Sequence, residues 1–264
     1  MIVFERLDIT AINTSNVVLS WAVEPTNEDL SVIEFQVERS ISQEGPFELI
    51  GQITDQFYFI DHNASHLSKW SDYFYRIKLT DSTGREVLSP VNSLDAGALS
   101  PRALYIIRAK SMVFRHIKGR DTLVYKRRQD GARCPECYDP IEEQVTQSDC
   151  PVCMGTGFLG GYYPPIRIQA HYMPVTARNR VGQELREIGY TQVDMMNFPL
   201  VVPRDVLYEV GKSNWWLINS VTPTEDQRMV VSQMLECRQI DPTRVETNLP
   251  MPTPADSEGL QLVI

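Results

Sequence analysis

The amino-acid sequence predicts a mainly β protein: an N-terminal β-sandwich, a central metal-binding knuckle and a small barrel-like domain. Short runs of alternating apolar and polar residues occur in both halves of the chain, and a period of two is typical of strands with one buried face. Between these halves, four cysteines form two close pairs. The expected segments are a sandwich over residues 1–97, a basic connector 98–133, a knuckle 134–158, a C-terminal β domain 159–241 and a flexible tail 242–264.

Length and composition favour a globular chain. It has 264 residues, 42% of them hydrophobic, which suits a packed core. No apolar run approaches the roughly 18 residues of a membrane-spanning helix, so no membrane partner is expected. The N-terminus has no basic stretch before an apolar run, so no signal peptide is expected. Five cysteines, four of them in CxxC pairs, favour a reducing compartment and a metal over disulfides.

Charge is distributed unevenly. Residues 1–99 hold 6 Lys/Arg and 15 Asp/Glu, and residues 134–264 hold 9 and 17. Residues 100–133 instead hold 10 Lys/Arg and 2 Asp/Glu. A short basic segment between acidic regions can meet phosphate or an acidic protein surface.

Four runs in the N-terminal region alternate as strands and are separated by turn residues. They cover residues 17–23, 33–39, 47–50 and 73–79, and Gly45-Pro46 and Asp81 to Gly84 supply turn signals. Several short strands at this spacing predict a β-sandwich.

The order of these features resembles a fibronectin type III domain over about 95 residues. The features are Trp21, Leu67, the strand from Tyr73 to Ile77, Gly84 and Ser89-Pro90. The resemblance implies that Trp21 is the core tryptophan and that Tyr73 is the tyrosine-corner residue. An Arg-Gly-Asp motif is missing from the domain. Core packing is the expected role of both aromatic residues.

The basic connector has two interpretations for its backbone. Ser100-Pro101 is typical of a helix start, and the apolar spacing after it is close to helical. The runs 105–107 and 112–114 are equally compatible with strands, so residues 100–125 stay open between helix and strand. The candidate docking or phosphate-contact residues of this segment are Arg115, Lys118, Arg120, Lys126, Arg127 and Arg128.

After the cysteines, a glycine-rich stretch leads into a second series of candidate strands. They cover residues 166–172, 194–198, 206–210, 215–221 and 229–240. Proline and glycine separate them, which predicts a second β domain, a small barrel. Proline, threonine and acidic residues dominate from residue 241 onward and predict a flexible tail.

The four paired cysteines predict one structural zinc ion. Cys134-Pro135-Glu136-Cys137 and Cys150-Pro151-Val152-Cys153 each place two sulfurs on one side of an ion, and the twelve residues between them form a loop. Zinc prefers four tetrahedral thiolates in closed structural sites. Two disulfides or free thiols are the alternative. A thioredoxin-like redox role needs a CxxC beside a βαβ unit, and none is evident.

The second half of this pattern resembles one repeat of the cysteine-rich region of J-type chaperones. It has the form Cys150-x-x-Cys153-x-Gly155-x-Gly157. That region needs several copies, so the resemblance implies zinc geometry and not a chaperone function. The fifth cysteine, Cys237, lies in a strand-like run and is expected to be buried and structural.

No catalytic motif is evident, and we expect a protein that is not an enzyme. The sequence has no GxSxG, no P-loop and no GxGxxG after a strand. An enzyme carrying a fibronectin accessory module is the weakest hypothesis.

The C-terminal region resembles the β-barrel of tailed-phage head-closure and connector proteins over about 70 residues. The carrying pattern is Asp205-Val206-Leu207, Gly211, and Trp216-Leu217-Ile218 up to Val221, followed by a strand from Val230 to Arg238. This resemblance implies a structural protein of a tailed-bacteriophage virion, assembled in the host cytoplasm as a ring-shaped homo-oligomer at the neck between head and tail. Its partners would be portal, neck or tail proteins, with DNA passing through an acidic lumen without specific binding. The alternatives are a nucleic-acid-binding zinc-ribbon protein and a baseplate or tail component.

Overall fold

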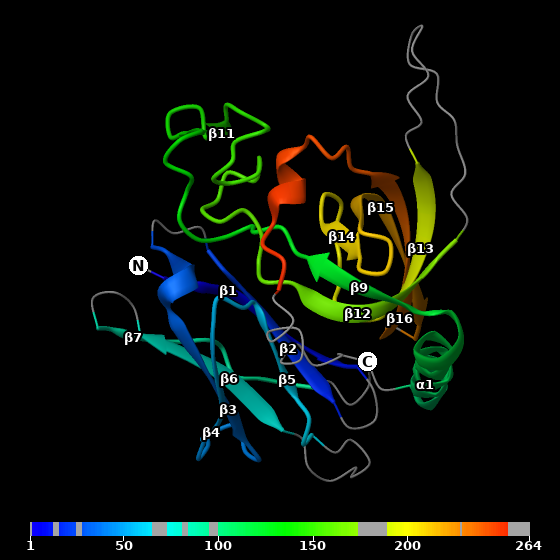
Figure 1. The fold of residues 1–264 in the computed structure, drawn as a ribbon. Helices are drawn as coiled ribbons and strands as arrows, with labels where there is room; N and C mark the ends of the chain where they lie inside the picture. The colour runs from blue at the N-terminus through cyan, green and yellow to red at the C-terminus, as the bar shows by residue number, and fades with distance from the viewer. Residues whose placement is uncertain are drawn as a thin grey trace, which may run out of the picture. The chain divides into compact units, whose positions relative to one another are not determined.

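The computed structural model describes residues 2–12, 16–24, 28–64, 73–80, 84–94, 100–173, 189–227 and 229–252. The chain divides into two compact units (Figure 1). The first contains residues 1–99 and 128–163, and the second contains residues 100–127 and 164–264. Both are built mainly of antiparallel strands, which confirms the predicted fold class.

The first unit contains two antiparallel sheets. Strand alternation specifies them, because each strand turns one set of side chains toward a shared core. One sheet has the order β1-β2-β5, and the other has the order β4-β3-β6-β7, with β8 also paired to β6. The strands are β1 (Phe4–Ala11), β2 (Val17–Val23), β3 (Glu34–Ser40), β4 (Glu48–Thr54), β5 (Tyr58–Asp61), β6 (Phe74–Thr80), β7 (Glu86–Leu88) and β8 (Asn92–Ser93), with a 3-10 turn η1 (Leu30–Val32) between β2 and β3.

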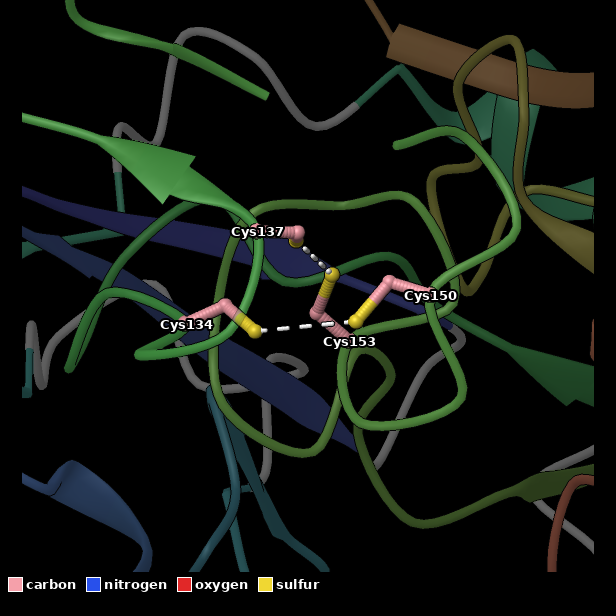
Figure 2. A group of neighbouring side chains, drawn as sticks. All are labelled: Cys134, Cys137, Cys150 and Cys153. Carbon is pink, nitrogen blue, oxygen red and sulfur yellow. Dashed lines mark hydrogen bonds between the residues drawn. The ribbon is translucent and has the colours of Figure 1, made fainter. Parts of the chain in front are cut away.

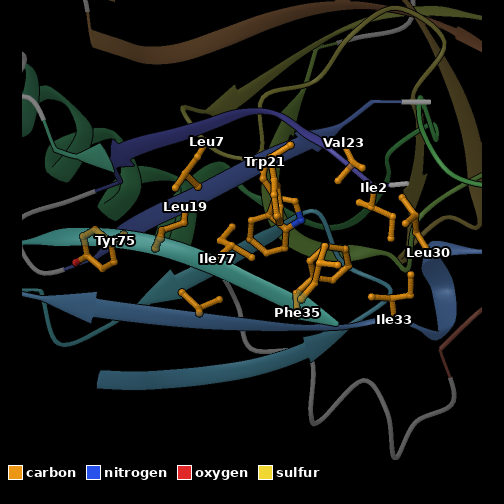
Figure 3. Close-up of a cluster of buried hydrophobic side chains, with 13 residues drawn as sticks. Ile2, Leu7, Leu19, Trp21, Val23, Leu30, Ile33, Phe35, Tyr75 and Ile77 are labelled. Carbon is orange, nitrogen blue, oxygen red and sulfur yellow. The ribbon is translucent and has the colours of Figure 1, made fainter. Parts of the chain in front are cut away.

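The core of this unit gathers around Trp21 of β2, as Figure 3 shows. The Trp21 ring lies 5.5 Å from the ring of Phe35 on β3, centroid to centroid. Leu19, Val37 and Ile77 are fully buried beside them. The predicted core position of Trp21 is therefore confirmed.

Tyr75 is the fully buried tyrosine of β6, whereas Tyr73 precedes the strand and is half-buried. The Tyr75 hydroxyl donates to Asp61 Oδ2 at 3.0 Å, and the Arg39 guanidinium pairs with the same oxygen at 2.8 Å. Tyr73 packs instead under the Arg39 guanidinium, 4.7 Å from the ring centroid. The sequence-based expectation is that Tyr73 is the tyrosine-corner residue. In the structure the buried tyrosine whose hydroxyl is hydrogen-bonded is Tyr75 instead. Leu67 lies outside the described residues.

The second unit is a closed barrel of six antiparallel strands. Its order around the barrel is β12-β13-β16-β15-β14-β9. Closure pairs every strand on both sides and so leaves no sheet edge. The strands are β9 (Arg120–Tyr125), β12 (Ile166–Tyr172), β13 (Tyr190–Met196), β14 (Val206–Glu209), β15 (Asn214–Asp226) and β16 (Met229–Gln239).

Strand β9 closes this barrel, although the sequence assigns it to a connector outside the C-terminal domain. Val124 of β9 lies opposite Ile166 of β12 on one side and opposite Leu207 of β14 on the other. All three side chains are buried. Two neighbouring barrel strands, β9 and β12, are therefore separated in sequence by the whole cysteine-containing segment, which is an insertion between them.

Residues 101–118 of the basic connector are helical and residues 120–125 form β9, which resolves the open choice between helix and strand. Helix α1 (Pro101–Val113) continues into a π-helical turn, η3 (Phe114–Lys118). Ser100 caps the helix, since its hydroxyl accepts from Ala103 N at 3.3 Å. Ala103, Ile107 and Phe114 form its buried side.

Residues 242–252 fold against the barrel unit, although the sequence predicts a flexible tail from residue 242. A 3-10 turn, η4 (Val245–Asn248), is followed by Leu249, which is buried. The Tyr125 hydroxyl donates to Pro250 O at 3.1 Å. Residues 253–264 lie outside the described residues. None of the described helices has the length and apolarity needed to cross a membrane.

Candidate metal centre

The four paired cysteines come together as one buried cluster (Figure 2). All four Sγ atoms lie within 4.8 Å of one another. Across the cluster, Cys134 Sγ lies 3.8 Å from Cys150 Sγ, and Cys137 Sγ lies 3.1 Å from Cys153 Sγ. Each cysteine is a free thiol, so the arrangement opposes the disulfide alternative. One ion can contact all four sulfurs.

Two similar turns position the two CxxC pairs. Tyr138 N donates to Cys134 O at 3.3 Å, and Met154 N donates to Cys150 O at 2.7 Å. Each turn thereby directs its two sulfurs to the same side. The link between the pairs is a hairpin of two short strands, β10 (Tyr138–Asp139) and β11 (Gln144–Val145).

Glycines at two positions after the second pair let the backbone wrap around the cluster. Gly155 and Gly157 have φ of +73° and +83°. A Cβ atom at Gly155 would lie 2.3 Å from Ser148 O, and one at Gly157 would lie 2.7 Å from Val145 Cγ2. Glycine alone fits both the conformation and the space.

Backbone N–H groups are directed at two of the sulfurs. Burial raises the pKa of the Cys153 thiol, although hydrogen bonds from the N–H groups of Gly157 and Gly155 oppose this effect. Burial also acts to raise the pKa of Cys150, but hydrogen bonds from the N–H groups of Cys153 and Val152 lower it overall. Such donors stabilise thiolates, the form that binds metal.

Apolar and aromatic side chains, with the Arg133 guanidinium stacked on two of the rings, shield the cysteine cluster from water. Arg133 places its guanidinium 4.3 Å from the Phe158 ring centroid and 4.6 Å from that of Tyr138. Tyr138, Val145 and Val152 pack against the cysteines, each of which is at most 2% exposed. Four protein ligands in a closed site leave no position for a substrate, so the arrangement suits a structural metal.

The cluster stands on a stem formed by the two ends of the insertion. Backbone hydrogen bonds join Arg128 N to Gly161 O at 3.0 Å, Leu159 N to Ala132 O at 2.9 Å and Cys134 N to Gly157 O at 2.9 Å. An isolated bridge pairs Arg133 with Phe158. Residues 128–163 are therefore one continuous structure, wider than the predicted knuckle 134–158, and we call them the knuckle insertion.

A buried polar network fixes this stem to the sandwich of the same unit, and sequence reasoning missed it. Asp130 accepts from Val23 N at 3.3 Å and from the Tyr163 hydroxyl. Arg128 pairs with Asp55 and lies 4.5 Å from the Tyr163 ring centroid. Asp130-Gly131 resembles an ordinary turn in the sequence, which hides its role.

The predicted basic contact residues separate into two groups. Three of them are in internal ion pairs: Arg120 with Glu209 at 2.6 Å, Lys126 with Asp205 at 3.2 Å, and Arg128 with Asp55. Arg127 is half-buried, and its N–H donates to Asp205 Oδ1 at 2.8 Å. Arg115 and Lys118 are exposed on η3. Three of the six predicted contact residues are therefore already paired with carboxylates of the same chain.

Cys237 is buried within the barrel, at 1% exposure, as expected. Burial raises the pKa of its thiol.

Comparisons with known proteins do not assign the chain to a family. No family model matches the sequence, and no curated protein matches it. Among solved structures, the pectate lyase Pel3 from Pectobacterium carotovorum is 22% identical over 37% of this chain and 29% of that chain, with a TM-score of 0.28. A structure of titin kinase and its flanking domains is 7% identical over 90% of this chain and 37% of that chain, also with a TM-score of 0.28. The chain spans well under half the length of either structure.

Proposed function

We propose that this chain is a structural protein of a tailed-bacteriophage virion, a subunit of the neck ring that connects head to tail. The observation that carries the proposal is the β14–β15 hairpin of the closed barrel. It contains the residues of the pattern that resembles head-closure barrels, with Val206 opposite Leu217 and Leu207 opposite Trp216.

The aspartate that opens this pattern has a structural role in the barrel. Asp205 is fully buried and accepts from Arg127 N at 2.8 Å and from Val202 N at 2.9 Å. Lys126 neutralises it at 3.2 Å. Asp205 therefore joins the end of β9 to the start of β14, at the point where the barrel closes.

We infer that the metal of the cysteine cluster is zinc. Four sulfurs at tetrahedral positions about 2.3 Å from zinc lie about 3.8 Å apart. The Cys134–Cys150 distance of 3.8 Å matches this edge, whereas the Cys137–Cys153 distance of 3.1 Å is shorter, so the second pair must open slightly around the ion. Zinc is redox-inactive and favours thiolate tetrahedra, which suits a site with no open position.

We also infer that the N-terminal sandwich is of the fibronectin type III kind. Its support is the packing of two antiparallel sheets around Trp21. A sandwich, a closed metal knuckle and a closed barrel are parts that suit a scaffold.

The internal ion pairs weigh against the alternative of a nucleic-acid-binding zinc ribbon. Arg120, Lys126 and Arg128 already have carboxylate partners. A DNA-binding surface needs several cations available to phosphate, with affinity that falls steeply as salt rises.

The proposal is tested on the phage whose genome encodes this chain. We expect mass spectrometry of purified virions to find the protein in a fixed, multiple copy number per particle. We expect a nonsense mutation in its gene to yield filled heads and free tails that do not join. Absence from virions, or normal particles without the protein, would exclude a neck role.

A further inference from the structure

The tip of the knuckle insertion presents one apolar side chain in an acidic setting. Ile141, between β10 and β11, is 90% exposed. Residues 134–158 contain five acidic residues and no Lys or Arg. Asp139 Oδ1 accepts from Ile141 N at 2.8 Å and from Glu142 N at 3.3 Å, which fixes the turn. We call Ile141, Glu142 and Glu143 the knuckle tip.

The outer side of helix α1 has the opposite character. Tyr105 and Met112 are 73% and 59% exposed, and they lie one above the other at a spacing of seven residues. Arg108 and Arg115 are exposed beside them. Residues 100–119 contain five Lys/Arg and no acidic residue. We call Tyr105, Arg108, Met112 and Arg115 the helix face.

The imbalance extends to the two units as wholes. Residues 1–99 and 128–163 hold 8 Lys/Arg and 21 Asp/Glu, a net charge of −13. Residues 100–127 and 164–264 hold 17 and 13, a net charge of +4. An acidic unit of one copy therefore attracts the basic unit of another, and like units repel.

We propose that the knuckle tip of one copy docks on the helix face of a second copy of this chain. Ile141 would pack against Tyr105 and Met112, and Glu142 and Glu143 would meet Arg108 and Arg115. This inference deepens the proposed neck function and rests on it, because it names the contact between neighbouring ring subunits.

A contact between two different surfaces has a consequence for the assembly. A pair of copies keeps one unused face on the first copy and one unused tip on the second, so association continues until the rotation closes a ring. The metal cluster then has a role in assembly, since it holds the hairpin that carries the knuckle tip. Four buried cysteines fix this hairpin, which has only two residues in each strand.

The test compares charge-reversed variants of the full chain by light scattering after size exclusion, at low and high ionic strength. We expect the wild type to be oligomeric at low salt and to dissociate as salt rises. We expect Arg108→Glu with Arg115→Glu, and separately Glu142→Arg with Glu143→Arg, to weaken self-association about 100-fold, because like charges then face each other. The chain that carries all four changes should associate again.

One control and one further variant keep the result specific. Glu44→Arg with Glu48→Arg makes the same charge change as Glu142→Arg with Glu143→Arg, but at exposed positions of the sandwich. It should leave the mass of the oligomer unchanged. Ile141→Asp removes the apolar contact and should yield monomers. Each variant must keep the metal content and circular dichroism of the wild type, which excludes misfolding as the cause.

Three outcomes would overturn the proposal. They are a wild type that stays monomeric at low salt, pair variants with unchanged mass, and a fourfold variant that is not rescued. DNA binding by the same variants is measured by gel shift. If Arg108→Glu with Arg115→Glu abolishes DNA binding and leaves the oligomer mass unchanged, the helix face binds nucleic acid instead. If the docking contact fails these tests but the protein is found in virions, the neck function still stands. If the fourfold variant restores the oligomer but the protein is absent from virions, only the neck function is refuted.

Discussion

The knuckle insertion and the barrel keep their folds by different means. In the barrel, six strands pair in a closed ring around fully buried side chains such as Val124, Ile168 and Met195. The knuckle insertion has two strands of two residues each, and its buried centre consists of four cysteines. Segments below about 40 residues seldom bury enough apolar surface to fold without a metal or a cross-link.

This difference between the barrel and the knuckle insertion predicts which of the two depends on the metal for its stability. The barrel contains no part of the cysteine cluster, so its stability should not depend on the metal. Metal binding in the insertion should instead be the same event as its folding, since its ligands come from two turns 16 residues apart.

The largest expected effect is that of metal removal. A chelator, or Cys153→Ser, should remove about 10 kcal/mol of metal-coupled folding free energy from the insertion. Hydrogen exchange followed by mass spectrometry should show lost protection across residues 128–163, with β12 and β16 unchanged.

The matched control for this change is Cys237→Ser, which alters a buried cysteine of the barrel. It should lower barrel stability and leave protection of the insertion intact. Equal loss of protection in both regions after metal removal would contradict the separation of the two.

The next largest effect tests the closure of the barrel. Asp205→Ala removes the buried carboxylate that pairs with Lys126 and accepts from the N–H groups of Arg127 and Val202, while Lys126 keeps its bond to Leu200 O at 2.7 Å. Removal of one partner of a buried ion pair costs about 3–5 kcal/mol. Urea unfolding of the barrel should report this loss.

Asp121→Ala is the comparison for that variant. It removes the pair with Arg167, whose partners are 30% and 34% exposed. Partly exposed pairs contribute about 1 kcal/mol or less, and the bidentate geometry of this pair places it at the upper end of that range. A similar loss in both variants would argue against a special role for Asp205.

A smaller effect concerns the start of helix α1. Ser100→Ala removes the cap acceptor for Ala103 N and the hydroxyl donor to Asp226, at 3.2 Å. The expected cost is about 1 kcal/mol, measured as a lower thermal midpoint of the barrel unit. Ser100→Asp keeps a cap acceptor and should recover part of the loss, unless repulsion from Asp226 outweighs it.

The smallest expected effect is a pH dependence in the anchor of the knuckle insertion. Burial raises the pKa of Asp130 above its ordinary 3.8, against hydrogen bonds from Tyr163 and Val23 N. The folded unit therefore holds this proton more tightly than the unfolded chain. Stability from this group is fully present below pH 3.8 and is lost as the pH rises through the folded pKa.

Asp130→Asn removes that dependence. From acidic pH to neutrality, the variant should lose less stability in hydrogen exchange of β2 than the wild type does. Asp55, whose pKa burial also raises, keeps its own contribution, so the slope should shrink without vanishing. An unchanged slope would show that Asp130 does not titrate in this range.

The sequence predicts local features of this fold better than its long-range pairings. Alternation locates β2, β3, β6 and β12 within a residue or so, because one face of each is buried. The CxxC spacing predicts the cluster, since four thiols in two tight turns have few other arrangements. The place of strand β9 in the barrel escapes the prediction, because it depends on partners about 40 and 80 residues away.

The sequence also does not predict Asp130, which fixes the knuckle insertion to the sandwich. Asp130 contacts Val23, 107 residues away, and nothing local distinguishes it from a turn aspartate. Residues 105–107 of helix α1 are ambiguous for a different reason, since aromatic and β-branched side chains suit strands as well. Ser100-Pro101 is the local signal that favours the helix, and the structure shows Ser100 capping it.

Native mass spectrometry of the intact chain tests the central claim most directly. The wild type and Cys237→Ser should each carry one zinc ion per chain, and Cys153→Ser should carry none. A wild type without metal, with four free thiols or with two disulfides, would contradict a metal centre at Cys134, Cys137, Cys150 and Cys153.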